Sequence, residues 1–249
     1  MLTIDIQNKS FDSDVSIIKN LHFSVDKNEI VALIGPSGAG KSTLLNLIAG
    51  LDEEFEGTIT SASCATHNIG LMFQEARLMP WLTVLENVLL VAEGRKDKQK
   101  AKQDALDILK LVGMESHEHA YPKQLSGGMT KRVALARAFM FNPEVLLMDE
   151  PFASLDAPSA EQLRQKLLIL QQQMSSSILY VTHDLTEAVA IADRIIFLTE
   201  KPMTVIEQRE VSLPRPRYLH DPEVSEICQF FYRQFPDLLC SHENSAKCM

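Results

Sequence analysis

The sequence contains no apolar run of the ~20 residues that a membrane-spanning helix requires. Residues 1–5 also lack the basic segment and the following apolar stretch that are typical of a signal peptide. We therefore expect the chain to have no membrane span of its own, so that any contact with a membrane goes through a partner protein.

Basic residues are outnumbered by acidic ones. The chain has 24 lysine and arginine residues against 33 aspartate and glutamate residues, which gives a formal net charge of −9. Proteins that bind nucleic acid through its phosphates usually carry a basic face. The charge balance therefore argues against nucleic acid as a partner.

Cysteine is rare, with four residues in a chain of 249. Such scattered residues do not form a disulfide framework, and they suit a reducing cytosol. Cys240, His242 and Cys248 could bind a soft metal, but a frayed C-terminus is the simpler interpretation. His117 and His119 are likewise interpreted as residues of a polar loop rather than as metal ligands.

Apolar residues are abundant, and their spacing indicates an α/β fold. Two early stretches, at 2–6 and 21–25, alternate apolar and polar residues as half-buried antiparallel strands do. Later strands, read from continuous apolar runs, alternate with stretches of helical periodicity, which predicts a mostly parallel sheet with helices on both faces. These strands and helices are expected at 30–34, 145–148, 163–174, 178–181, 185–192 and 195–198.

A helical segment interrupts this pattern between about residues 75 and 130. Thr83 and Glu86 form the sequence of a capping box, and Gly113 is a suitable helix stop. We predict a helical subdomain inserted into the α/β core. The main domain is predicted over 1–217 and a short helical tail over 218–249.

The strongest motif lies between the apolar run at 30–34 and a helix. It fits the phosphate-binding loop GxxxxGK[ST], in which backbone N–H groups and a helix N-terminus face phosphate oxygens. The lysine would contact the β- and γ-phosphates, and the serine hydroxyl after it would ligate Mg²⁺. The sequence therefore predicts a nucleoside triphosphate site. Its residues are Gly35, Pro36, Ser37, Gly38, Ala39, Gly40, Lys41, Ser42 and Thr43.

Two acidic residues, Asp149 and Glu150, follow the apolar run at 145–148. Carboxylates at the C-terminal edge of a parallel sheet face the crevice where ligands bind. With the phosphate loop upstream, we predict that Asp149 holds the Mg²⁺ shell and that Glu150 polarises the attacking water.

A second candidate anion site is formed by Ser126, Gly127 and Gly128 at the start of a helix expected from about Thr130 to Phe141. One nucleotide does not need two such sites in a single chain. We interpret this one as serving the nucleotide that is held by another copy of the chain.

Together these motifs resemble those of the ATP-binding subunits of ATP-binding-cassette (ABC) transporters. Residues 35–43 resemble the Walker A motif, 145–149 the Walker B motif and 125–129 the family signature, in family order within about residues 1–217. The resemblance implies an ATPase with ATP and Mg²⁺ as cofactors.

The same resemblance implies roles for four more residues. Gln74, in the Q-loop, would contact Mg²⁺ and water and sense the membrane subunit, and His183, in the H-loop, would lie at the γ-phosphate. Asp156 matches the D-loop. Phe11 would stack on adenine by its position, although it could equally be a core strand residue.

Finer features resemble importers of nitrate, sulfonates, taurine and pyrimidine precursors. They are residues 72–81, 125–129 and 213–217. Residues 158–160, which follow Asp156 and Ala157, depart from that pattern, and this weakens any assignment of the solute. The implied partners are two membrane permease subunits, a second copy in an ATP-sandwich homodimer and, indirectly, a solute-binding protein. The implied location is peripheral, at the cytoplasmic face of the inner membrane. Trp81 could pack at a helix start or contact the membrane partner.

Two other classes of function are weighed against an importer. A soluble ABC-type ATPase acting on nucleic acid or ribosomes would share the core motifs, but such proteins add coiled coils, a second cassette or basic surfaces that this sequence lacks. A P-loop kinase or GTPase would have neither the signature at 125–129 nor the His183 motif.

Overall fold

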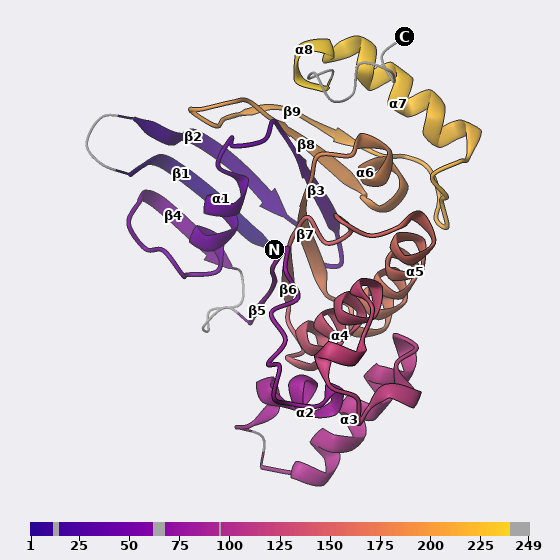
Figure 1. Cartoon of the computed structure of the whole chain (residues 1–249). Coiled ribbons are helices and arrows are strands. Elements are labelled where there is room, and N and C mark those ends of the chain that lie inside the picture. The colour runs from indigo at the N-terminus through magenta and orange to yellow at the C-terminus, as the bar shows by residue number, and fades with distance from the viewer. Residues whose placement is uncertain (12–14, 62–67, 95, 240–249) are drawn as a thin grey trace. The chain divides into compact units, whose positions relative to one another are not determined.

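The computed structural model describes residues 1–11, 15–61, 68–94 and 96–239, and it divides the chain into two compact units (Figure 1). The first unit comprises residues 1–65 and 178–249, and the second comprises residues 66–177. Cys240, His242 and Cys248, considered above as a frayed end, lie outside the described residues. In the part of the chain that is described, no helix has the length and apolar character to cross a membrane.

The first unit begins with an antiparallel sheet of β1 (Leu2–Ser10), β2 (Ser16–Val25) and β4 (Glu56–Ser61), in the order β2-β1-β4. In this sheet Ile4 pairs with Phe23 on one side and with Ile59 on the other. Leu2, Ile4 and Ile6 are buried, as the period of two in their sequence requires. The predicted N-terminal antiparallel subdomain is therefore confirmed.

The same unit contains the central parallel strands. β3 (Ile30–Ile34) lies between β7 (Ser177–Thr182) and β8 (Arg194–Leu198) and runs parallel to both. All five residues of β3 are buried, as expected for an apolar strand that is covered on both faces. β9 (Val205–Glu210) adds antiparallel to β8.

The described residues of this unit include four helices. α1 (Lys41–Ile48) follows β3, and α6 (Leu185–Ile191) follows β7, so each begins just beyond the carboxyl end of a parallel strand. α7 (Pro222–Gln234) packs against α6 and places Phe231 against Phe197, and α8 (Pro236–Leu239) ends the described chain. The boundary predicted between a main domain over 1–217 and a tail over 218–249 stays a prediction.

The second unit pairs β5 (Ile69–Met72) in parallel with β6 (Val145–Asp149). Its helices confirm the predicted helical insert, although the limits of 75 and 130 stay a prediction. The capping box is present, with Glu86 N–H donating to Thr83 Oγ1 at 3.3 Å and Thr83 N–H donating to Glu86 Oε2 at 2.8 Å. The helices of this unit are α2 (Val84–Leu89), η1 (Leu90–Ala92), α3 (Lys98–Leu111), η2 (Glu115–His117), η3 (Pro122–Gln124), α4 (Gly127–Met140) and α5 (Ala157–Met174).

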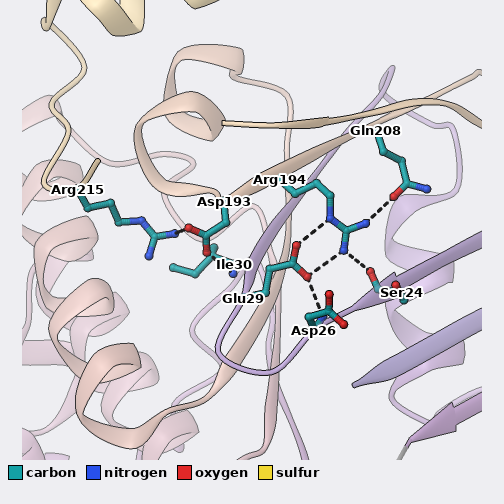
Figure 2. Close-up of polar contacts among 8 residues, drawn as sticks. All are labelled: Ser24, Asp26, Glu29, Ile30, Asp193, Arg194, Gln208 and Arg215. Atoms are coloured by element: carbon teal, nitrogen blue, oxygen red, sulfur yellow. Dashed lines mark hydrogen bonds and ion pairs between the residues drawn. The ribbon is translucent and has the colours of Figure 1, made fainter. Parts of the chain in front are cut away.

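A polar cluster ties the two sheets of the first unit together (Figure 2). Arg194, at the start of β8, donates to both carboxylate oxygens of Glu29 at 2.8 and 2.9 Å. It also donates to the carbonyl of Ser24 on β2 at 2.6 Å. Because the guanidinium spans β8, β2 and the turn before β3, it fixes the end of the parallel sheet relative to the antiparallel one.

This cluster makes stability depend on pH. Burial raises the pKa of Glu29, but hydrogen bonds from Arg194 and Asp26 N–H and the charge of Arg194 outweigh burial, so the pKa lies below its ordinary value. A lowered pKa contributes stability above the pKa of the unfolded chain, and that stability is lost as the pH falls through the folded value.

We predict that Glu29→Gln makes the free energy of unfolding depend less on pH under acidic conditions. The free energy of unfolding of the wild type should fall as the pH falls below about 4.3. The variant should have a lower free energy of unfolding at about pH 6, and that free energy should fall less over the same pH range. Urea unfolding between about pH 6 and pH 3.5 would measure this. Glu53→Gln, at an exposed glutamate, is the matched control. Identical slopes for the two variants would contradict the assignment.

Candidate functional site

The predicted site residues belong to both units. The first unit carries the phosphate loop, the candidate adenine-stacking residue and the H-loop histidine, and the second carries the carboxylates, the Q-loop, the signature and the D-loop. In the first unit these are Phe11, residues 35–43 and His183; in the second they are Gln74, Ser126, Gly127, Gly128, Asp149, Glu150 and Asp156.

The phosphate loop closes between β3 and α1 around a buried lysine. The ammonium of Lys41 donates to the carbonyl oxygens of Gly35 and Pro36, both at 2.7 Å. Ser42 lies exposed in the first turn of α1. The loop thus holds a cation beside the N-terminus of a helix, an arrangement that attracts phosphate oxygens.

Gly40 caps α1 with a φ of 108°, a conformation that residues with a side chain rarely adopt. A Cβ at Gly40 would lie 2.6 Å from the Cγ2 methyl of Ile17, a buried residue of β2. Gly50, beyond the end of α1, also has a positive φ of 69°, but a Cβ there would meet nothing within 4 Å. A side chain at Gly40 would therefore meet both backbone strain and a clash, whereas a side chain at Gly50 would meet backbone strain alone.

We predict that Gly40→Ala destabilises the protein more than Gly50→Ala. Both substitutions should cost about 1–2 kcal/mol in backbone strain, and Gly40→Ala should lose about 1–3 kcal/mol more through overpacking against Ile17. Chemical unfolding of both variants measures the difference. Equal losses would show that the loop relaxes around the new methyl group.

Phe11 lies just after β1 and is 54% exposed, and the ammonium of Lys9 lies 4.7 Å from the centroid of its ring. Lys9 is itself buried and paired with Asp52 at 2.7 Å. The alternative that Phe11 is a core strand residue is therefore wrong, because the residue lies beyond the end of β1 and is exposed. Its stacking on adenine stays a proposal.

His183 follows β7 and is exposed. Its two neighbours in the chain, Thr182 and Asp184, both make hydrogen bonds to α6. The Thr182 hydroxyl donates to Glu187 Oε2 at 2.6 Å. Asp184 caps α6 by accepting from the N–H groups of Thr186 and Glu187 at 2.8 and 3.2 Å. The start of α6 thus fixes the backbone from which the imidazole projects.

In the second unit, the structure brings Gln74 to Glu150. The amide of Gln74 donates to Glu150 Oε2 at 3.4 Å. Glu150 has a φ of 41°, which costs energy in a residue other than glycine and is typical of functional sites. Asp149 ends β6 and is half-buried.

Sequence reasoning missed two basic residues on α4 that hold the Q-loop. Buried Lys131 donates to the carbonyl of Gln74, and Arg137 donates to the carbonyls of Ala76 and Arg77 at 2.8 and 2.9 Å. Burial lowers the pKa of Lys131, although the charges of the Walker B carboxylates work in the opposite direction. The available signal was the presence of basic residues within a helix whose other residues are largely buried.

The signature and the helix that follows the D-loop also meet in this unit. Ser126 caps α4 by accepting from Met129 N–H at 3.3 Å, so the helix begins at Gly127 rather than near Thr130 as predicted. Asp156 caps α5, and its hydrogen bond with Ser159 lowers its pKa. A Cβ at Gly128 would lie 3.0 Å from the Ser159 side chain. The stretch that departs from the importer pattern, 158–160, therefore lies directly against the signature.

The donor set of the predicted metal site suits Mg²⁺. Gln74 and Asp149 offer oxygen ligands in the second unit, and Ser42 offers a hydroxyl in the first. Softer metals favour thiolate, thioether or imidazole ligands instead. Among the described residues, no group of three or more histidine, cysteine, aspartate or glutamate side chains gathers as a metal site.

Comparisons with known proteins agree with this assembly of motifs. The family model described as "ABC transporter" matches residues 18–153. The aliphatic sulfonates import ATP-binding protein SsuB of Bacillus cereus (strain ATCC 10987 / NRS 248) is 40% identical over 94% of this chain and 95% of its own length. The protein of the same name from Bacillus subtilis (strain 168) is 38% identical, with 94% of each chain covered.

Solved structures give the same result for the fold. The ATP-binding cassette MJ0796, solved as a dimer in a post-hydrolysis state bound to ADP and Pi, aligns with a TM-score of 0.73 at 31% identity. The alignment covers 86% of this chain and all of that chain (100%). CbiO1 from Clostridium perfringens aligns with a TM-score of 0.77 over 95% of this chain and 97% of its own, at 24% identity, and so shares the fold.

Proposed function

Because the chain belongs to the ABC transporter family and is an ATP-hydrolysing subunit of that family, we propose that it energises the import of an aliphatic sulfonate through partner membrane subunits. The observation that carries the proposal is the similarity to two sulfonate-import subunits over nearly the whole chain. Taurine, itself a sulfonate, is included in the proposal, and nitrate and pyrimidine precursors are the comparison solutes.

We propose that ATP binds with its phosphates on residues 35–43 and its adenine on Phe11. Lys41 would neutralise the β- and γ-phosphates, and its buried position beside the loop carbonyls supports this role. Bound Mg²⁺, held by Ser42, Gln74 and Asp149, would supply charge neutralisation between the phosphates. Glu150 would take a proton from the attacking water, and His183 would donate to the γ-phosphate as charge develops there.

The Q-loop is proposed to link this chemistry to the membrane subunits. Gln74 contacts Glu150, and the segment that follows leads to Trp81, whose side chain is 70% exposed. A tryptophan this exposed does not serve as a packing residue at a helix start. We assign it to the contact with the membrane partner, since aromatic residues are enriched at protein interfaces.

Two copies are proposed to form the active unit. In each site, the phosphate loop of one copy would meet Ser126, Gly127 and Gly128 of the other, because a two-fold axis makes each surface serve its counterpart. The dimeric cassettes similar to this chain support the arrangement. A peripheral position at the cytoplasmic face of the inner membrane, with a solute-binding protein acting indirectly, completes the proposal.

Transport in vesicles tests the proposed solute. The chain would be reconstituted with the membrane subunits that copurify with it and with its solute-binding protein, with ATP supplied on the cassette side. Labelled aliphatic sulfonate should accumulate, whereas a matched preparation carrying Glu150→Gln should not take it up. Uptake of nitrate or a pyrimidine precursor instead would refute the sulfonate assignment. Hydrolysis stimulated by DNA or ribosomes, without membrane partners, would favour the soluble ATPase.

A further inference from the structure

The carbonyl end of α6 is held by an arginine that lies far along the chain. The last carbonyls of a helix have no partner within the helix. Nη1 of Arg217 donates to Val189 O at 2.6 Å and to Ala192 O at 3.0 Å. The Arg217 side chain is buried, and a cation at this end also matches the helix dipole. Arg217 therefore caps α6 from outside the helix.

The segment that carries Arg217 is itself anchored to the central strand. Arg215, two residues earlier, pairs with Asp193 Oδ1 at 2.6 Å (Figure 2). The other oxygen of Asp193 accepts from Ile30 N–H at 2.9 Å, and the N–H of Asp193 donates to Ile30 O at 2.8 Å. The two arginines thus connect the first residue of β3 with the last turn of α6.

The opposite end of α6 carries the H-loop. His183 directly precedes the capping Asp184, and the buried pair of Thr182 and Glu187 joins the end of β7 to the first turn of the helix. α6 has seven residues, so its two ends are about 10 Å apart. Arg217 and His183 thus lie at opposite ends of one short helix, and α6 connects them.

Apolar packing alone does not fix how α6 lies along its axis. The apolar residues of α6, which are Leu185, Ala188, Val189, Ala190 and Ile191, are all buried, but hydrophobic burial is not directional. The two hydrogen bonds from Arg217 are directional and act on carbonyls of the last turn. They are therefore suited to set the position of α6 along its axis, and with it the position of the imidazole.

We propose that Arg217 is a positioning residue for hydrolysis, which acts by holding α6 so that His183 meets the γ-phosphate. The inference rests on the proposed role of His183. It also assigns a task to the Leu213–Arg217 stretch, which carried only a subfamily resemblance in the sequence. A displacement of about 1 Å in a catalytic group can cost up to about 100-fold in rate, which sets the scale of the expected effect.

A double-mutant cycle tests the proposal. Steady-state ATP hydrolysis would be measured for the wild type, His183→Ala, Arg217→Ala and the double variant. Arg217→Ala should lower kcat by roughly 10–100-fold with the KM for ATP unchanged, because the phosphate loop is untouched. The double variant should be no slower than His183→Ala alone. Arg233→Ala, at an exposed arginine on α7, is the matched control.

Two further measurements separate positioning from folding. Guanidinium ion at a non-denaturing concentration should restore part of the rate of Arg217→Ala, since it can refill the site between the two carbonyls. Arg217→Lys, which keeps a donor in this position, should retain an intermediate rate even if Arg217→Ala does not fold. The same cycle can then be run with Arg217→Lys in place of Arg217→Ala.

The outcomes are distinguishable. If His183→Ala hydrolyses ATP at the wild-type rate, the proposed role of His183 fails and the inference fails with it. If His183→Ala is slow and the double variant is slower still by the full factor that Arg217→Ala causes alone, only the inference is overturned. The same holds if the folded Arg217 variant hydrolyses ATP at the wild-type rate. A rise in KM without a fall in kcat would also overturn it.

Discussion

Replacing Glu150 with glutamine should lower ATP hydrolysis by roughly 10²–10⁴-fold while ATP still binds. The amide keeps the shape of the side chain and an oxygen that can accept from Gln74, so the local structure is preserved. It removes the group that takes the proton from water. Phosphate release at saturating ATP, together with a nucleotide titration, measures both quantities, and Glu226→Gln on the exposed side of α7 is the control.

The same variant should hold two copies together. Uncleaved ATP would remain between the phosphate loop of one copy and the signature of the other, so size exclusion with ATP and Mg²⁺ should show a dimer. A profile that remains monomeric, combined with normal turnover, would remove Glu150 from the role of general base.

Lys41→Ala should weaken ATP binding by roughly 1.5–3 kcal/mol, because a charge-assisted contact with the phosphates is lost. That free energy corresponds to a loss of about 10–150-fold in affinity. The substitution also leaves the carbonyls of Gly35 and Pro36 without the ammonium that they contact at 2.7 Å, which would add to the effect. Calorimetric titration with ATP measures the change, and Lys19→Ala, at an exposed lysine of β2, is the control. An unchanged affinity would remove Lys41 from the phosphate site.

Mixing this variant with Ser126→Arg tests whether the site is shared. In a mixed dimer with shared sites, one site carries both lesions and the other carries neither, so the mixture should hydrolyse more ATP than either variant alone. If both motifs act within one chain, every site remains broken and no gain appears. A covalently linked dimer that carries one substitution in one copy then shows whether both sites must hydrolyse ATP together.

The parts of the fold that were predictable from the sequence depend on local patterns. Alternation in β1 and β2, the capping box at Thr83 and the motif at 35–43 each involve residues that are near one another in the chain. The strands β4, β5 and β9 were not predicted. All three pair at the edges of their sheets, and β4 and β9 have largely polar sequences, whereas β5 has only four residues.

The parts of the candidate site that escaped prediction depend on partners far along the chain. Lys131 and Arg137 contact carbonyls at 74 and at 76–77, and carbonyls carry no signature in the sequence. The positive φ of Glu150 likewise reflects the surroundings of β6 rather than a preference of glutamate. The roles of the motif residues came from their resemblance to a family, and they stay proposals until the variants are measured.

The hold of α4 on the Q-loop has a consequence for evolution. Lys131 and Arg137 contact the main chain of residues 74–77 and not its side chains. Substitutions at Glu75 and Ala76 therefore leave these hydrogen bonds in place, because every amino acid supplies the same carbonyl. Arg77 is more constrained, because it has a φ of 43° and its guanidinium lies over the Phe73 ring. The surface at positions 75 and 76 is thus free to change between lineages while the link to the signature helix is kept.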